Sequence, residues 1–312
     1  MKKLQASEVN LRGGVIVAAV TPRRAHEYSI DLAATLELVD FLCQGGADGI
    51  ALLGSTGEFV HFALDDRRHM LKFAAKRSRL PLLVNVSHST LDGAVELARE
   101  AAADGVSGVL LMPPFYFRYD QEAIRSFFLT FAEEMNHAVP IYLYNIPVFA
   151  NELEIQTALE LLSTGLFAGI KDSSGSWKYF TALQQSRALD AQPDFTLFVG
   201  HDAIYSKARA CGANGVISGV ACALPELMAA LEKAIPAGDS GRLSGLESRL
   251  AEFMSWIEHF PAPVGIKEAV RLRKLKMGAC AVPLGQEGCR KLAEFGEWFR
   301  GWLPEVLREC GQ

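Results

Sequence analysis

Short runs rich in valine, isoleucine and leucine recur along the chain, and longer segments with apolar residues at helical spacing separate them. The runs are almost continuously apolar, which is typical of strands buried on both faces of a parallel sheet. The intervening segments, such as SIDLAATLELVDFLCQGGA, begin near a serine, threonine or aspartate and end in glycine, as helices commonly do. The pattern predicts strands over residues 14–20, 49–54, 82–87, 108–113, 141–146, 167–172, 196–201 and 215–220.

Eight strand–helix units within roughly 220 residues match the count and size of a TIM barrel, the (β/α)8 fold. A doubly wound sheet is the alternative, because periodicity alone does not show that a barrel closes. That fold would favour a glycine-rich dinucleotide fingerprint after the first strand, and AAVTPRRAHE contains none. We therefore predict an α/β protein built on a closed (β/α)8 barrel.

The strand pattern stops after about residue 235. The stretch IPAGDSGRLSG, rich in glycine and serine, is predicted to be a linker. Helical spacing resumes over roughly 242–259, 265–277 and 284–309. The predicted organisation is a barrel over residues 11–235 and a C-terminal helical extension over residues 236–312.

Composition restricts the class of protein. Half of the residues are apolar and 21% are charged, which suffices for a large packed core. The net charge of −5 argues against nucleic acid as a partner, because phosphate binding requires a basic face. The apolar runs are shorter than the ~18 residues of a membrane span, so no membrane partner is expected. The run GGVIVAAV is predicted to be the first strand and not a signal peptide, since TPRR follows it without a cleavage site.

Cysteine and histidine spacing gives no sign of a metal centre. The six cysteines are scattered without a CxxC pair, which argues against a disulfide framework or a zinc site and favours a reducing cytoplasm. The seven histidines show no HExxH spacing, and no acid cluster resembles a metal cage. We therefore expect neither a metal nor another cofactor.

In a barrel, reactive side chains lie where the strands end, at the C-terminal face. Lys171 follows the apolar run FAGI near the end of the predicted sixth strand, which directs it toward the barrel mouth. A lysine held among apolar neighbours can act as a neutral amine that attacks a ketone. The alternative is a lysine that caps the strand or pairs with Asp172. Its position within the barrel pattern favours the reactive amine.

Other strand ends carry groups that could act beside this lysine. Tyr144, near the end of the predicted fifth strand, could shuttle protons, or it could be an interior tyrosine with a satisfied hydroxyl; the sequence leaves both open. The turn GSTGE after the second strand offers adjacent hydroxyls and backbone N–H groups, a natural carboxylate site. His201 and Asp202, which follow the seventh strand, could contact substrate.

The motifs GSTGE, YNIP and GIKDSSG, on the second, fifth and sixth strands in this order, resemble those of the dihydrodipicolinate synthase/N-acetylneuraminate lyase family. The resemblance runs from about residue 11 to residue 300 and includes PAPVGIKEAV in the helical tail. Members of that family are class I, lysine-dependent pyruvate aldolases. The resemblance implies a (β/α)8 barrel with a C-terminal helical extension, usually assembled as a homotetramer.

The resemblance also implies roles, position by position. Lys171 resembles the Schiff-base lysine and Tyr144 the tyrosine that relays protons. Ser55 and Thr56 resemble the hydroxyl pair that holds the pyruvate carboxylate, and Ser55 would also link to the relay. Tyr116 in PPFYFR resembles a second relay tyrosine, which in many members reaches across a dimer interface into the neighbouring site. The positions that would line the pyruvate pocket are Gly200 and Ile217.

One departure from the family pattern bears on the substrate. Dihydrodipicolinate synthases follow YN-P with an arginine that grips the carboxylate of the aldehyde substrate, and here Phe149 occupies that place. Because a phenyl ring donates no hydrogen bond to a carboxylate, the lysine-biosynthesis reaction is not expected. The candidates on the acceptor side of the site are Phe149, Asn151, Ser173, His201 and Asp202.

The predicted function is therefore a lyase or aldolase that makes or breaks a C–C bond next to pyruvate. An enzyme that dehydrates a 2-oxo-3-deoxy sugar acid through the same imine is one alternative. A catalytically silent binding protein on the same barrel is another, and the retention of Lys171, Tyr144 and the hydroxyl pair weighs against it. The acceptor aldehyde, the direction of the reaction and any effector site stay open.

Overall fold

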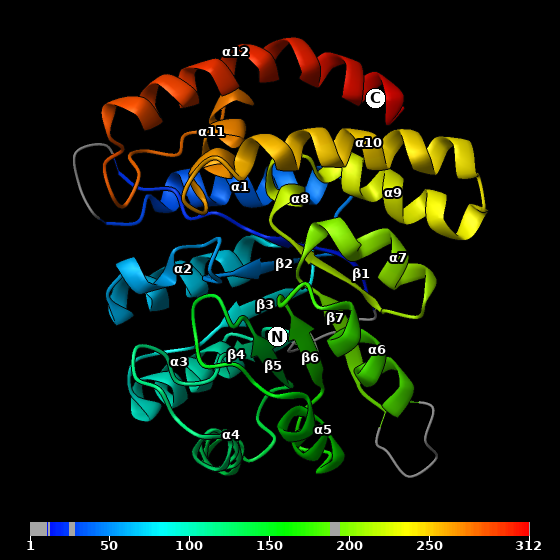
Figure 1. The fold of residues 1–312 in the computed structure, drawn as a ribbon. Helices are drawn as coiled ribbons and strands as arrows, with labels where there is room; N and C mark the ends of the chain where they lie inside the picture. Colours follow the sequence, from blue (N-terminus) through cyan, green and yellow to red (C-terminus); the bar gives the residue numbers. More distant parts are fainter. Residues whose placement is uncertain (1–10, 12, 25–28, 188–193, 312) are drawn as a thin grey trace, which may run out of the picture.

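The computed structural model describes residues 11, 13–24, 29–187 and 194–311 (Figure 1). Within these residues, eight parallel strands form a closed barrel in chain order. The barrel closes where the first strand pairs with the last, with Ile16 opposite Ile217. The strands are β1 (Gly14–Ala18), β2 (Gly49–Leu52), β3 (Leu82–Asn85), β4 (Gly108–Leu111), β5 (Ile141–Asn145), β6 (Gly169–Asp172), β7 (Thr196–Val199) and β8 (Gly215–Ser218).

The predicted TIM barrel is confirmed, and the doubly wound alternative is wrong because the pairing of β1 with β8 closes the sheet. Each predicted strand contains the observed one, and GGVIVAAV supplies β1. Nearly every strand residue is buried, since the barrel interior covers one face of each strand and the surrounding helices cover the other. This double burial explains why the strands appear in the sequence as continuous apolar runs.

Helices surround the barrel and connect successive strands (Figure 1). Four of them begin at a side chain of the expected type: Asp31, Thr90, Asp120 and Ser176 each accept a hydrogen bond from a backbone N–H in the first turn. The helices and 3-10 turns of the barrel region are α1 (Leu32–Gln44), η1 (Phe59–His61), α2 (Leu64–Arg77), α3 (Leu91–Ala103), α4 (Gln121–Met135), α5 (Ile155–Ser163), α6 (Trp177–Ser186), η2 (Asp202–Ile204), α7 (Tyr205–Ala210), α8 (Val220–Ala223) and α9 (Pro225–Ala237).

Beyond the barrel lie α10 (Ser240–Ile257), α11 (Val264–Leu272) and α12 (Gln286–Glu309), which confirm the helical extension. Helix α11 ends earlier than the predicted stretch 265–277. These helices pack against one another and against α9, along one side of the barrel (Figure 1).

The predicted linker IPAGDSGRLSG is wrong. Helix α9 continues to Ala237 and α10 begins at Ser240, so two residues connect them. Gly238 has a left-handed φ of 68°, which ends α9, and the Asp239 side chain accepts a hydrogen bond from Arg242 N to begin α10. The glycine and serine residues that suggested a flexible linker belong to a tight turn and to the first turns of α10.

Aromatic side chains form the contact between α10 and α12. The rings of Phe253 and Trp302 stack with centres 6.0 Å apart, and Phe295 and Phe299 lie beside them. All four are buried, so the helical extension has an apolar core of its own next to the barrel.

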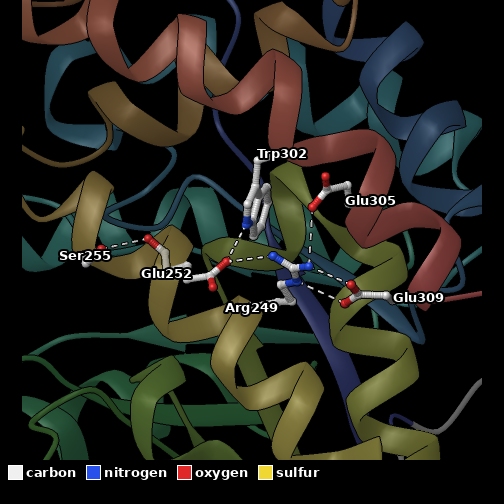
Figure 2. Close-up of polar contacts among 6 residues, drawn as sticks. All are labelled: Arg249, Glu252, Ser255, Trp302, Glu305 and Glu309. Atoms are coloured by element: carbon white, nitrogen blue, oxygen red, sulfur yellow. Dashed lines mark hydrogen bonds and ion pairs between the residues drawn. The ribbon is translucent and has the colours of Figure 1, made fainter.

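A polar network borders this aromatic contact (Figure 2). Arg249 of α10 donates to Glu309 of α12 with an Nη2–Oε1 distance of 2.6 Å, and it also pairs with Glu305 and Glu252. Trp302 Nε1 donates to the same Glu252 carboxylate. The acidic partners are well exposed, so this network contributes less to stability than the buried rings do.

Among the helices of the described residues, none combines the length and the apolar character that crossing a membrane would require.

Candidate active site

Lys171 lies in β6 with an enclosed side chain, 3% exposed. In the sheet register its Cα is opposite Tyr144 of β5 and Phe198 of β7. The Lys171 Nζ lies 4.0 Å from the centre of the Tyr144 ring. The structure therefore places an enclosed amine against the face of a tyrosine, near the ends of two adjacent strands.

The hydroxyl of Tyr144 is buried and bonded to Ser55, with an Oη–Oγ distance of 3.0 Å. Ser55 belongs to the turn after β2, residues 54–58, which we call the hydroxyl turn. Thr56, the next residue of this turn, lies close to Gly219 after β8: a β-carbon on Gly219 would be 3.4 Å from Thr56 Oγ1. The motifs of strands two, five and six thus meet at one end of the barrel, as predicted for a shared site.

Close backbone contacts hold the hydroxyl turn in place. The carbonyl of Gly57 accepts a hydrogen bond from Thr21 Oγ1 at 2.7 Å, and Glu58 N donates to Ser55 O at 3.0 Å. A β-carbon on Gly57 would lie 3.0 Å from the backbone of Leu53, which is closer than such atoms normally approach. Glycine is required here because the turn folds directly against the end of β2.

Gly200, which follows β7, lets the side chains of Lys171 and Ser173 pack against its backbone. A β-carbon at this position would lie 2.9 Å from Lys171 Cε and 2.0 Å from Ser173 Oγ. Ser173 therefore lies next to the same lysine stem. Any side chain larger than hydrogen at position 200 would displace one of these groups.

Asp172 does not form the ion pair with Lys171 that the sequence left open; its carboxylate is bound by other groups. Asn145 Nδ2 donates to it at 2.9 Å, and Ser174 donates from its backbone N at 3.1 Å and from its hydroxyl at 2.8 Å. Burial raises the pKa of the Asp172 carboxyl, and the hydrogen bonds from Ser174 and Asn145 oppose that shift.

The bond between Asn145 and Asp172 joins the ends of β5 and β6, and it thereby fixes the neighbouring Tyr144 relative to Lys171. Asn145 is itself held, since its Oδ1 accepts a hydrogen bond from Leu153 N. Sequence reasoning missed this hydrogen bond between the two strand ends. The available signal was that an asparagine and an aspartate directly follow the two candidate residues.

Asp202 is buried at the start of η2, and its Oδ1 has no hydrogen-bond partner among the described residues. Burial raises the pKa of the Asp202 carboxyl, while hydrogen bonding to Ser218 and the positive charges of His201 and Lys171 oppose the shift. Asp202 therefore lies within electrostatic reach of the lysine. His201 is exposed and lies over the loop after β6, near Gly175.

Asn151 occupies a different place from the one predicted. Both hydrogens of its side-chain amide are donated within the β4–α4 loop, to Pro114 O at 2.6 Å and Phe117 O at 2.7 Å. Its Oδ1 accepts from Tyr119 N. Asn151 is thus a structural anchor of that loop and leaves no amide hydrogen for a substrate.

The loop anchored by Asn151 also carries Tyr116. Its side chain is 89% exposed, its backbone has a φ of 78°, and its ring contacts Phe117 edge-on. No hydrogen bond to Tyr144 or Ser55 is formed by Tyr116 within the described residues.

Phe149 is 56% exposed and lines a cavity of about 280 Å³ next to Ser55. The remaining lining residues are Glu58, Phe59, Val60, His61, Met112, Phe115 and Ala262. The wall is largely apolar, and none of these residues is an arginine or lysine. Ile217, the other predicted pocket residue, is buried in β8.

The described residues contain no group of three histidine, cysteine, aspartate or glutamate side chains that could hold a metal ion.

A (β/α)8 barrel with an enclosed lysine near the end of β6 and a tyrosine beside it has the fold and site of a class I lyase or aldolase, an enzyme that works through a lysine Schiff base. The sequence matches the dihydrodipicolinate synthetase family over residues 11–297. The chain belongs to this family, and it is an enzyme of that lysine-dependent class.

Among the curated relatives, 4-hydroxy-tetrahydrodipicolinate synthase of Pelobacter propionicus is 31% identical, and the match covers 96% of this chain and 98% of the relative. Among the solved structures, Escherichia coli YagE, a family member in complex with pyruvate, has a TM-score of 0.84 at 24% identity over 94% of this chain and 99% of that one. The sialic acid aldolase of Ruminococcus gnavus has a TM-score of 0.84 at 23% identity, covering 95% and 99%. At these identities the structural likeness shows the shared fold.

Proposed function

We propose that this protein forms an imine between Lys171 and pyruvate, or a 2-oxo-3-deoxy acid, and makes or breaks the C–C bond next to the pyruvate unit. The proposal depends on one observation: the enclosed Lys171 amine lies against Tyr144, whose hydroxyl is bonded to Ser55 at 3.0 Å. An amine, a phenol and an alcohol in contact supply a nucleophile and a proton path, which imine chemistry needs. The pyruvate complex of YagE supports a pyruvate site in this family.

The hydroxyl turn is the proposed binding site for the carboxylate. The side chains of Ser55 and Thr56 donate hydrogen bonds, and the backbone N–H groups of a glycine-flanked turn add to them. Gly200 brings its backbone close to Lys171 and Ser173, and Ile217 supplies an apolar wall. With the carboxylate fixed, the C2 carbonyl can be held within reach of the amine.

In the proposed reaction, the nitrogen lone pair of Lys171 attacks C2 of the ketone, and the carbonyl oxygen takes a proton to give a carbinolamine. Tyr144, linked to Ser55, delivers the proton with which water leaves, and the protonated imine forms. For cleavage, the C4 hydroxyl loses its proton and the C3–C4 bond breaks. Its electron pair forms the C2–C3 double bond of an enamine while the C=N electrons return to nitrogen. The aldehyde leaves, and protonation at C3 and hydrolysis release pyruvate.

The acceptor side does not suit a second carboxylate. Phe149 occupies the place of the arginine that dihydrodipicolinate synthases use, and the cavity beside it has a largely apolar wall. We therefore propose that the reaction differs from that named for the synthase relatives.

Condensation of pyruvate with aspartate semialdehyde should be slow, since a lost charged hydrogen-bond partner costs about 2–3 kcal/mol, or roughly 30- to 150-fold in rate. A coupled assay with this aldehyde tests the point. Turnover of aspartate semialdehyde as the best substrate in a panel would contradict it.

Dehydration of a 2-oxo-3-deoxy sugar acid through the same imine is the second candidate. Here C3 loses a proton to form the enamine, and the C4 hydroxyl then leaves as water. The polar groups near the lysine favour a hydroxylated substrate, because Asp202 has an unpaired carboxylate oxygen within the described part of the chain and Ser173 lies against the lysine stem. A screen of sugar acids that detects pyruvate separately from other 2-oxo acids distinguishes cleavage from dehydration.

We also propose that the site is completed by a second copy of the chain in a homotetramer built as a dimer of dimers. Tyr116 is exposed and forms no hydrogen bond to Ser55 of its own chain within the described residues, and the cavity beside Ser55 opens toward solvent. A tyrosine donated by a neighbouring subunit would extend the proton path from Tyr144 and Ser55.

Trapping with borohydride tests the imine. Wild-type protein incubated with pyruvate and borohydride should gain the mass of one reduced pyruvate per chain, because reduction fixes the imine as a secondary amine. Lys171→Ala should gain none, and Lys171→Arg should also fail, since a guanidinium stays protonated. If the wild type gains no mass, or Lys171→Ala gains it equally, the proposed site is wrong; a silent binding protein would also give no mass gain.

A further inference from the structure

A buried ion pair connects the helical extension to the hydroxyl turn. Lys267 of α11 donates from Nζ to Glu58 Oε2 at 2.7 Å, and the two side chains are 4% and 6% exposed. Glu58 is the last residue of the turn that carries Ser55 and Thr56. A contact between residues 209 positions apart thus reaches the proposed carboxylate site.

A second contact from α11 reaches the same turn. A β-carbon on Gly219 would lie 3.0 Å from Ile266 Cδ1 and 3.4 Å from Thr56 Oγ1, so Ile266 and Thr56 both lie against this glycine. Ala262, just before α11, lines the cavity next to Ser55 together with Glu58. The start of α11 therefore adjoins the hydroxyl turn at Glu58 and near Thr56.

The backbone couples Glu58 directly to Ser55. Glu58 N donates to Ser55 O at 3.0 Å, and Glu58 has a left-handed φ of 54°. This backbone conformation is uncommon for a residue other than glycine and persists only where the surrounding contacts hold it. Loss of the contact that holds Glu58 would therefore let the turn relax and shift Ser55.

We propose that Lys267, acting through Glu58, is a positioning residue that holds the hydroxyls of Ser55 and Thr56 where they bind the substrate carboxylate. Without the ammonium group, the buried Glu58 carboxylate would have no compensating charge, and the cost of leaving it buried would drive it toward the cavity it lines. The helical extension is then part of the active-site architecture. This inference rests on the proposed function, because it assumes that the hydroxyl turn binds the 2-oxo acid.

The alternative is that the ion pair only fastens α11 to the barrel. A matched control exists at the other end of the same helix. Arg273 pairs with Glu226 of α9 at 2.6 Å, with both side chains 11% exposed, and it also donates to Ala223 O. This pair fastens α11 to α9 and makes no contact with the hydroxyl turn among the described residues.

The experiment uses the full-length chain with the substitutions Lys267→Met, Glu58→Gln and, as control, Arg273→Met. Borohydride trapping is followed over a range of pyruvate concentrations, together with thermal unfolding of each variant. Lys267→Met should raise the pyruvate concentration for half-maximal trapping at least about tenfold, while trapping at saturation approaches that of the wild type. Arg273→Met should lower the unfolding temperature but keep the half-maximal concentration within about twofold of the wild type.

A folded Lys267→Met variant with the wild-type half-maximal concentration overturns the inference. So does an equal rise in Arg273→Met, because it would show that general loosening of α11 is sufficient. If Lys267→Met does not fold, Glu58→Asp keeps the charge and withdraws the carboxylate by one methylene group; an unchanged half-maximal concentration in that variant overturns the inference as well. If wild-type protein is not trapped, the proposed function fails first, and this inference fails with it.

Discussion

At the scale of single residues, the site is defined by the contact between an enclosed amine and a buried phenol. Tyr144 is fully buried, and its hydroxyl is bonded to Ser55. In the proposed mechanism, the phenol gives and accepts protons at the oxygen on the carbon that Lys171 attacks.

Tyr144→Phe should keep the packing of the ring and remove the proton relay. We expect turnover to fall by a factor of about 10²–10⁴, with a smaller effect on the free energy of unfolding. Steady-state kinetics and urea denaturation of the same preparation check the two effects separately. Retention of full activity would mean that another group carries the protons.

Asp202 gives a prediction for the pH dependence of stability. Burial raises the pKa of its carboxyl above the ordinary value of 3.8, so the native state holds this proton more tightly than the unfolded state. The contribution of this group to stability is therefore full below the ordinary pKa and is lost as the pH rises through the raised one. Asp202→Asn removes this loss. The stability of the variant relative to the wild type should increase as the pH rises from about 4 toward neutral.

Urea denaturation at several pH values in that interval measures the effect of Asp202→Asn. A difference in the free energy of unfolding that stays constant with pH would contradict the explanation by a raised pKa.

At the scale of elements, the aromatic contact between α10 and α12 stabilises the extension more than its polar border does. Phe295 is fully buried, and its ring contacts those of Phe253 and Trp298. Arg249 is partly exposed among carboxylates that are themselves solvated (Figure 2). Truncation of a buried ring removes packing contacts that water does not replace. Removal of Arg249 leaves acidic groups that water can solvate.

Phe295→Ala should therefore lower the free energy of unfolding by about 3–5 kcal/mol, and Arg249→Ala by about 1 kcal/mol or less. Urea denaturation of the two variants provides the comparison. An Arg249→Ala effect equal to that of Phe295→Ala would show that the ion-pair network acts as a cooperative unit.

At the scale of the whole molecule, we propose that the site depends on assembly through Tyr116. The side chain is exposed at the mouth of the barrel, on a loop that Asn151 holds in place. If a neighbouring subunit receives this tyrosine, a chain that lacks the lysine and a chain that lacks the tyrosine should regain activity when they are combined.

Mixing Lys171→Ala with Tyr116→Ala, after dissociation and reassembly, tests this arrangement. In mixed dimers the Tyr116→Ala chain keeps its lysine and receives a tyrosine from its partner. With random pairing, half of the dimers are mixed and each has one intact site, so about a quarter of wild-type activity should return. A chain that is monomeric by light scattering and fully active would rule out the shared site.

The sequence by itself determined the eight strand–helix units and the position of the lysine. Strands covered on both faces appear as continuous apolar runs, so each βα unit could be recognised within its own segment. A cation near the end of such a run, as at Lys171, is notable because the local pattern predicts that it is enclosed. Tyr144 and the hydroxyl turn were found in the same way, from their places after other strands.

Only the tertiary structure decided which polar groups form hydrogen bonds and ion pairs with one another. Composition suggested a linker over residues 235–245, where capping by Gly238 and Asp239 makes a tight turn between two helices. The sequence placed Asn151 among the substrate contacts, whereas its amide holds a loop. Glu58 and Lys267 pair across 209 positions. Local periodicity reports how each segment is buried, but the partner of a buried polar group is set by the closure of the barrel and the packing of distant helices on it.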